Sequence, residues 1–115
     1  PIFANQILSG KPLTIYNDGE QRRDFTYVGD VVNANILAAT NPEDLKGEAF
    51  NIGNGNNYSV NELADMLGGE KSYGNKVIEP FQTLADNSKA LLILDWDPKG
   101  DLPTWIETYK KELGI

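Results

Sequence analysis

Two adjacent arginines, Arg22 and Arg23, have the clearest potential for binding chemistry in this sequence. They are the only arginines among 115 residues that carry a formal net charge of -7. Arginine presents a planar fork of donors that fits phosphate oxygens in bidentate contacts. A phosphate ligand of an acidic protein needs such a local concentration of positive charge, so the pair is a candidate phosphate-binding site. The alternative interpretation is a surface ion pair with Asp24 or Glu20.

The composition excludes several kinds of catalytic site. The chain contains no Cys, which rules out disulfides, thiolate zinc sites, iron–sulfur clusters and thiol nucleophiles. It contains no His either, which rules out a Ser-His-Asp triad. Carboxylates are abundant, but no pattern among them indicates a hydrolytic dyad or a metal site. The acidic balance argues against nucleic acid or an anionic membrane as a partner, and no apolar run is long enough to span a bilayer.

Motifs for binding a dinucleotide are also missing. The nearest match to G-x-G-x-x-G starts at Gly53 and Gly55, but Tyr58 occupies the third glycine position. We interpret this segment as a turn between a strand and a capped helix. There is no Gly-Lys-Ser/Thr phosphate loop, and none of the five tyrosines is followed four residues later by lysine. No residue of this chain is therefore predicted to be catalytic or to bind a cofactor.

Hydrophobic periodicity and turn signals predict an α+β chain of one domain, with short strands and about five helices. Strands are expected at 13–16, 25–28, 50–52 and 77–78, and helices at 2–9, 31–40, 59–67, 88–94 and 101–113. The polar residues 70–76 predict a loop. Ser59 and Glu62 have the spacing of a capping box at the start of the third helix, and Asp30 is expected to cap the second.

Six segments, in this order along the chain, carry a resemblance to a known family. They are GKPLTIYNDGEQRRDFTYVGDVV at 10–32, FNIGNG at 50–55, SVNEL at 59–63, ADNSKA at 85–90, LDWDP at 94–98 and the last helix with Trp105. Together they resemble the NAD-dependent nucleotide-sugar epimerases and dehydratases, which are extended short-chain dehydrogenase/reductases. The resemblance implies that residues 1–115 are the C-terminal, nucleotide-sugar-binding domain of such an enzyme, the C-terminal portion of an extended Rossmann-type α/β fold.

The resemblance implies a function for the complete protein, with a UDP-sugar 4-epimerase as the leading hypothesis. In the family, an N-terminal Rossmann domain binds NAD and supplies a catalytic Tyr and Lys spaced four residues apart. These motifs are absent here, so the 115-residue chain by itself is expected to be inactive and to bind no cofactor. The complete protein is expected to be a cytoplasmic homodimer. A 4,6-dehydratase of the same family and a non-catalytic, truncated binding module are the alternatives.

The resemblance also implies roles for four residues. Thr14 and Tyr16 match a strand edge whose backbone groups bind the nucleotide base, with the Tyr16 ring stacked on the base; ordinary strand packing is the alternative for Tyr16. Arg23 matches the arginine that clamps the pyrophosphate, and Asp86 matches a position that contacts the ribose. The family commonly has a second phosphate-binding arginine just before the ADNSKA segment, whereas residues 79–84 of this chain contain none.

Overall fold

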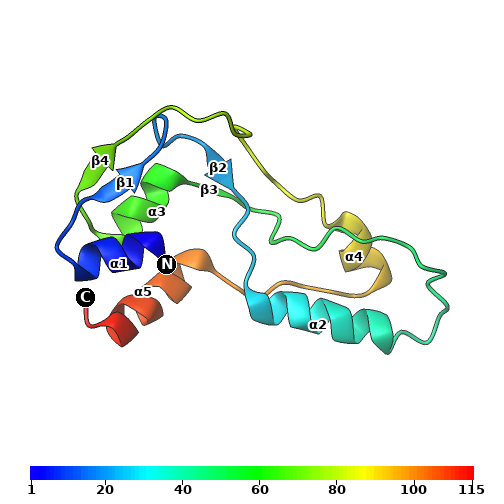
Figure 1. Ribbon diagram of the computed structural model, residues 1–115. Coiled ribbons are helices and arrows are strands. Elements are labelled where there is room, and N and C mark those ends of the chain that lie inside the picture. Colours follow the sequence, from blue (N-terminus) through cyan, green and yellow to red (C-terminus); the bar gives the residue numbers. More distant parts are fainter. The chain divides into compact units, whose positions relative to one another are not determined.

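The computed structural model describes all 115 residues, which divide into two compact units (Figure 1). The first unit comprises Pro1–Arg23, Tyr58–Thr83 and Leu102–Ile115, and the second comprises Asp24–Asn57 and Leu84–Asp101. The five helices and the short strands confirm the predicted α+β class.

The helices have 6 to 12 residues and the strands have two or three. The helices are α1 (Ile2–Leu8), α2 (Val28–Ala39), α3 (Val60–Leu67), α4 (Ser88–Ile93) and α5 (Leu102–Leu113). The strands are β1 (Leu13–Ile15), β2 (Arg22–Arg23), β3 (Tyr58–Ser59) and β4 (Lys71–Tyr73). β1 pairs with β4 in parallel, and β2 pairs with β3 in antiparallel orientation.

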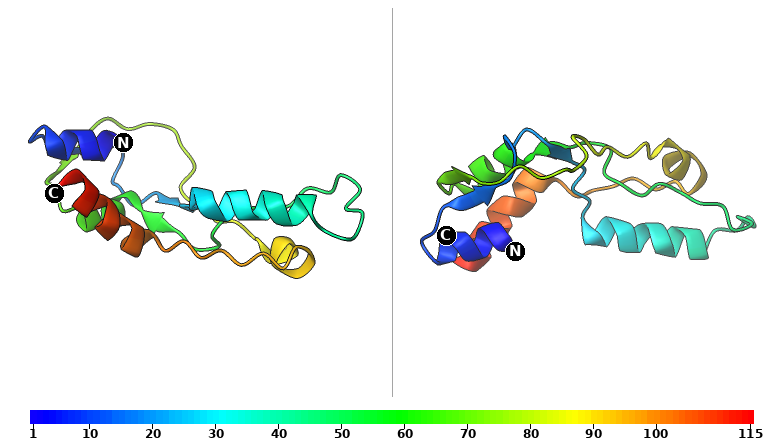
Figure 2. Two further views of the ribbon diagram at one scale, coloured as in Figure 1. Left: turned by 90° about the horizontal axis from the view of Figure 1, so that it is seen from below. Right: turned by 45° about the horizontal axis from the view of Figure 1, so that its top comes forward.

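The core of the first unit is built on β1. Leu13 and Ile15 point to the same side of the strand, and both are fully buried against Ala64 of α3. Helix α1 covers this cluster with Phe3 and Ile7. Helices α1 and α3 both contact β1, and α3 also lies against α5 (Figure 2). Apolar side chains of α1 and α3 therefore pack against the buried face of the strand that leads to Tyr16.

Local sequence sets both ends of α3. At its start, the Ser59 Oγ accepts the N–H of Glu62 at 3.0 Å, and the Glu62 carboxylate accepts the N–H of Ser59 at 2.7 Å. This confirms the predicted capping box. At its end, Gly68 takes a left-handed conformation with φ of 84°, which glycine adopts without a side-chain clash.

The core of the second unit is built around a tryptophan. Trp96 is fully buried in one cluster with Ala34 of α2 and Ala90 and Leu94 of the α4 region, and Phe50 packs against this cluster. The indole N–H of Trp96 donates to the backbone carbonyl of Asp30 at 2.9 Å. A buried indole needs such a partner, so this hydrogen bond ties the core to the start of α2.

Two carboxylates organise the irregular segments of the second unit. Asp24 accepts the backbone N–H groups of Asn54 and Gly55, both at 2.9 Å, and that of Ala85 at 3.1 Å. Asp30 is buried and accepts the N–H groups of two residues in the 99–100 turn at 2.9 and 2.7 Å. The backbone of these loops is therefore satisfied by side chains instead of by strand neighbours.

Several predicted elements differ from the observed ones. Residues 25–28 do not form a strand, because the ladder lies earlier, at Arg22–Arg23, and Val28 already begins α2. Residues 50–52 and 77–78 form no strand either. The predicted loop 70–76 contains β4, whose three exposed polar residues pair with β1 through the backbone. Asp30 lies within the first turn of α2, where it anchors the 99–100 turn instead of capping the helix.

Candidate functional site

The backbone of Thr14 is engaged by the first helix. Its N–H donates to the Gln6 Oε1 at 3.1 Å, and the Gln6 Nε2 donates to the Thr14 Oγ1 at 2.9 Å. The Gln6 side chain thus binds both the backbone N–H and the side-chain hydroxyl of Thr14. The Thr14 amide already has a partner, so a nucleotide base would have to use other backbone groups near this strand.

Tyr16 follows β1 directly and presents its ring to solvent. The residue is 49% exposed, so its ring has a free surface. Its backbone carbonyl accepts a hydrogen bond from the Gln21 Nε2 at 3.0 Å. Gln21 itself is buried, and its Oε1 atom has no hydrogen-bond partner. An exposed aromatic side chain is what stacking on a nucleotide base requires.

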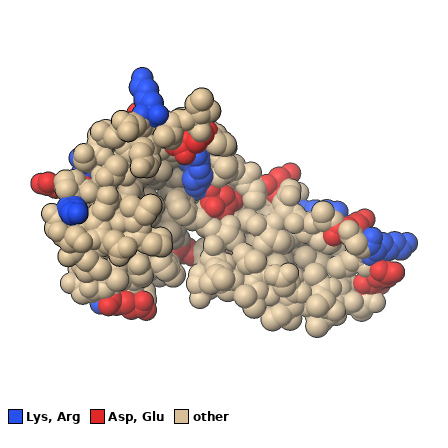
Figure 3. All heavy atoms as spheres, viewed as in Figure 1, with Lys and Arg blue, Asp and Glu red and all other residues tan.

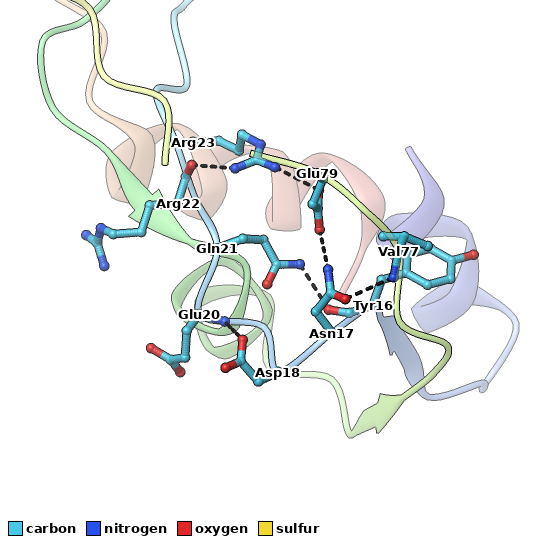
Figure 4. A network of polar contacts seen from close by, with 9 residues as sticks. All are labelled: Tyr16, Asn17, Asp18, Glu20, Gln21, Arg22, Arg23, Val77 and Glu79. Carbon is cyan, nitrogen blue, oxygen red and sulfur yellow. Dashed lines mark hydrogen bonds and ion pairs between the residues drawn. The ribbon is translucent and has the colours of Figure 1, made fainter. Parts of the chain in front are cut away.

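Arg23 is positioned by the β2–β3 ladder, in which it lies opposite Tyr58. Its guanidinium makes two hydrogen bonds (Figure 4). Nη1 donates to the backbone carbonyl of Arg22 at 2.7 Å, and Nη2 lies 2.7 Å from the Glu79 Oε2. A guanidinium has five N–H donors, and these contacts use one donor on each terminal nitrogen of Arg23, whose side chain is 25% exposed.

Asn17 connects the Tyr16 region to the partner of Arg23. The Asn17 Nδ2 donates to the Glu79 Oε1 at 2.9 Å, and the Asn17 Oδ1 accepts the N–H of Val77 at 2.9 Å. Asn17 has φ of 56°, a left-handed conformation that asparagine tolerates better than most residues. Figure 4 shows these side chains as one polar network between β1, β2 and the 77–79 segment.

The two arginines have different carboxylate partners. Arg22 lies 3.2 Å from the Glu62 Oε2, whereas Arg23 pairs with Glu79. Both partners are distant in the sequence, and sequence reasoning identified neither. The alternative interpretation of the arginines, an ion pair with a surface carboxylate, thus describes part of their environment, but with partners that only the fold brings close.

Asp86 belongs to the second unit and is engaged locally. One carboxylate oxygen accepts the hydroxyl of Ser88 at 2.6 Å and the Ser88 N–H at 3.1 Å. These two hydrogen bonds lower the pKa of Asp86 below its ordinary value, because they favour the charged form. The structure thus places Thr14, Tyr16 and Arg23 in one unit and Asp86 in the other.

The Gly53–Gly55 loop does not fit the phosphates of a dinucleotide. A glycine-rich loop binds phosphate through unpaired backbone N–H groups. Here the N–H groups of Asn54 and Gly55 both donate to the Asp24 carboxylate, which occupies the position that an anion would need. This agrees with the interpretation of the segment as a turn, and the loop is no candidate for binding NAD.

The remaining charges are dispersed. Basic and acidic side chains lie interspersed on the face shown in Figure 3. Lys71 pairs with Asp65 at 2.6 Å, and Lys99 pairs with Asp97 at 2.5 Å; each carboxylate raises the pKa of its lysine. No group of three or more His, Cys, Asp or Glu side chains is arranged to hold a metal ion. None of the five helices has both the length and the apolar character needed to cross a bilayer.

Comparison with known sequences identifies relatives of this chain. Residues 1–53 match the NAD dependent epimerase/dehydratase family. An uncharacterized UDP-glucose epimerase of Bacillus subtilis is 40% identical over 107 residues, covering 87% of this chain and 34% of the relative. A UDP-glucuronate 4-epimerase of Thermodesulfobacterium geofontis is 36% identical over 107 residues, covering 84% of this chain and 32% of the relative. The chain thus spans about a third of the length of these relatives.

Solved structures resemble this fold over nearly its whole length. The UDP-glucuronic acid 4-epimerase of Bacillus cereus, in complex with UDP-glucuronic acid and NAD, has a TM-score of 0.86 and 32% identity, covering 98% of this chain and 38% of that one. The UDP-glucose 4-epimerase of Thermotoga maritima with UDP-glucose has a TM-score of 0.80 and 35% identity, covering 97% and 39%. The chain belongs to the NAD-dependent epimerase/dehydratase family, within the extended short-chain dehydrogenase/reductases.

Proposed function

We propose that this chain is the nucleotide-sugar-binding domain of an NAD-dependent epimerase, most simply a UDP-sugar 4-epimerase. The observation that carries the proposal is that Asn17, the residue after the exposed Tyr16, is joined to the Arg23 guanidinium through the Glu79 carboxylate. An aromatic ring suits a nucleotide base, and a guanidinium suits a diphosphate. Relatives whose names include UDP-glucose and UDP-glucuronate support the choice of a UDP-sugar.

In this proposal, the chain contributes by binding and orienting the substrate. Tyr16 would stack on the base, backbone groups near Thr14 and Tyr16 would bind its edge, and Arg23 would hold the diphosphate. Asp86 would contact the ribose, although its carboxylate already accepts two hydrogen bonds from Ser88. Fixing the nucleotide end of the substrate limits where the sugar can lie, and such positioning lowers the entropic part of a reaction barrier.

The catalytic groups and NAD are assigned to a part of the complete protein beyond these 115 residues. The Gly53–Gly55 loop does not fit a dinucleotide, and the chain contains no Tyr-x-x-x-Lys. We therefore propose that the 115-residue chain alone does not turn over UDP-sugars. We also propose a cytoplasmic homodimer for the complete protein. A dehydratase of the same family would use the same nucleotide-binding residues.

The decisive test is the affinity of the complete protein for UDP, measured by calorimetry with and without Arg23. We expect Arg23→Ala to weaken binding about tenfold or more, because a hydrogen bond to a charged group contributes ~1.5–3 kcal/mol. The matched control is Arg22→Ala, which removes the same charge one residue away, where the guanidinium pairs with Glu62. Unchanged affinity in Arg23→Ala, or an equal loss in both variants, would refute the role of Arg23 as a phosphate clamp.

A further inference from the structure

The carboxylate of Glu79 accepts a hydrogen bond from the Arg23 Nη2. The distance from the Arg23 Nη2 to the Glu79 Oε2 is 2.7 Å, which is a short, charge-assisted hydrogen bond. A carboxylate offers a guanidinium two oxygens in nearly the geometry of two phosphate oxygens. In this structure Glu79 uses one of its oxygens on Arg23, so Glu79 and a diphosphate are alternative partners for the donor at Nη2.

The charges around Arg23 determine how strongly this site attracts a diphosphate. With Glu79 in place, the Arg23 pair carries no net charge. The neighbouring Arg22 is likewise paired, with Glu62 at 3.2 Å, and the chain as a whole has a formal net charge of -7. Residues 79–84 contribute no arginine or lysine that would offset the acid. Arg23 therefore presents a net positive charge to a diphosphate only when the Glu79 carboxylate has moved away from it.

The surroundings of Glu79 allow it to leave. Glu79 lies on an irregular segment after β4, and its side chain is 29% exposed. Apart from Arg23, the carboxylate is held by the Asn17 Nδ2 at 2.9 Å. Asn17 also fixes the segment through the N–H of Val77. Figure 4 shows Glu79 between these two holding side chains, with no other labelled residue bonded to its carboxylate.

We propose that Glu79 is an internal competitor at Arg23 that sets the affinity of this site for a diphosphate. When the ligand binds, its phosphate oxygens replace the Glu79 carboxylate on the guanidinium, and Glu79 turns to solvent or remains with Asn17. The inference rests on the proposed role of Arg23 as the diphosphate clamp.

The test compares two glutamates, each paired with one arginine. Calorimetry on the complete protein at low salt would measure the affinities for UDP and, separately, for inorganic pyrophosphate. We expect Glu79→Gln to bind both ligands about 2- to 5-fold more tightly, which is the size of an exposed ion pair. The matched control is Glu62→Gln, which removes the same charge beside Arg22 and keeps the capping box, because Gln also serves at that position. Its affinities should equal those of the wild type.

A second variant tests the mechanism without changing any charge. Asn17→Gly removes the side chain that holds Glu79 and keeps a residue suited to the left-handed backbone at this position. We expect it also to tighten the binding of pyrophosphate. In addition, the gain from Glu79→Gln should shrink as salt is raised, since the screening length falls from about 10 Å at 0.1 M to about 3 Å at 1 M.

Other results of these measurements would overturn either the role of Glu79 or the proposed function. Equal or weaker binding by Glu79→Gln would overturn the inference, because Glu79 would then serve to orient Arg23. An equal gain in Glu62→Gln would also overturn it, since net charge alone would explain the effect. If Arg23→Ala leaves UDP affinity unchanged, the proposed function itself fails. If Arg23→Ala weakens binding but Glu79→Gln does not tighten it, only the competition by Glu79 is refuted.

Discussion

The two units of this chain differ in where their backbone hydrogen bonds go. In the first unit, strands supply partners to one another, with β1 paired to β4 and β2 paired to β3. The second unit contains no paired strands, and the carboxylates of Asp24 and Asp30 accept the N–H groups of its loops. Buried backbone groups need partners in either case, but here they obtain them by different means.

This difference predicts different sensitivities to substitution. The hydrogen bonds between paired strands join backbone groups, so most exposed side chains on these strands can be substituted with little loss in the free energy of unfolding. A carboxylate that serves several loops concentrates the hydrogen bonding of those loops on one residue. The second unit should therefore respond more strongly to single substitutions at its organising residues, and paired variants in the two units can test this.

The largest effect is expected at the tryptophans, one of which lies in each unit. Trp96 is fully buried and donates its indole N–H to Asp30, whereas Trp105 is 44% exposed and stacks on Tyr109. Trp96→Ala should reduce the free energy of unfolding by about 3–5 kcal/mol, because it leaves a large cavity. Trp105→Ala should cost much less. Urea denaturation followed by circular dichroism would measure both, and similar losses would contradict the contrast.

A smaller loss is expected when one of the organising carboxylates becomes an amide. Asp30→Asn replaces one acceptor oxygen with an NH2 group that faces a backbone N–H in the 99–100 turn. Leaving a buried donor unsatisfied costs about 1–3 kcal/mol in the free energy of unfolding. Asp97→Asn is the control, since Asp97 forms an exposed ion pair with Lys99, which contributes about 0–1 kcal/mol. Equal denaturation midpoints for Asp30→Asn and wild type would remove Asp30 from its organising role.

The smallest effect is expected at the capping box in the first unit. Ser59→Ala removes the acceptor for the Glu62 N–H but leaves the backbone pairing of β3 with β2 in place. The loss in the free energy of unfolding should be about 1 kcal/mol, the ordinary cost of removing an N-cap side chain. Ser59→Thr should restore most of it, because its hydroxyl accepts the same hydrogen bond without placing a second carboxylate beside Glu62. Failure of this rescue would mean that Ser59 stabilises the unit by some other contact.

Features of α3 that depend on residues close together in the sequence were predicted correctly, whereas strand pairing between distant residues was not. The start and end of α3 depend on Ser59, Glu62 and Gly68, which lie within ten residues, and both ends were predicted correctly. Strand β4 was missed because Lys71–Tyr73 has no apolar alternation; its partner β1 is distant in the sequence, and only backbone groups connect the two. The apolar residues at 25–28 suggested a strand, but Val28 starts a helix that packs through Ala34.

The candidate site likewise has features that the sequence shows and contacts that only the fold creates. The scarcity of arginine in an acidic chain is visible in the sequence and marks Arg22 and Arg23 as candidates for binding phosphate. The roles of Tyr16 at a base and of Arg23 at a diphosphate were implied by the family resemblance. Their roles stay predictions until binding is measured. The pairing of Arg23 with Glu79 across 56 residues could not be predicted, because several carboxylates were equally available as partners.

The sequence by itself determined the α+β class, the two ends of α3 and, through the order of six segments along the chain, the family resemblance. The ends of α3 depend on side chains only a few residues apart. Only the tertiary structure decided which acid faces each arginine, which loops Asp24 and Asp30 hold, and that Asp86 belongs to a different unit from Arg23. The physical reason is that ion pairs and loop contacts form between residues far apart in sequence. The path of the folded backbone determines which of these residues meet, and a short stretch of sequence does not specify that path.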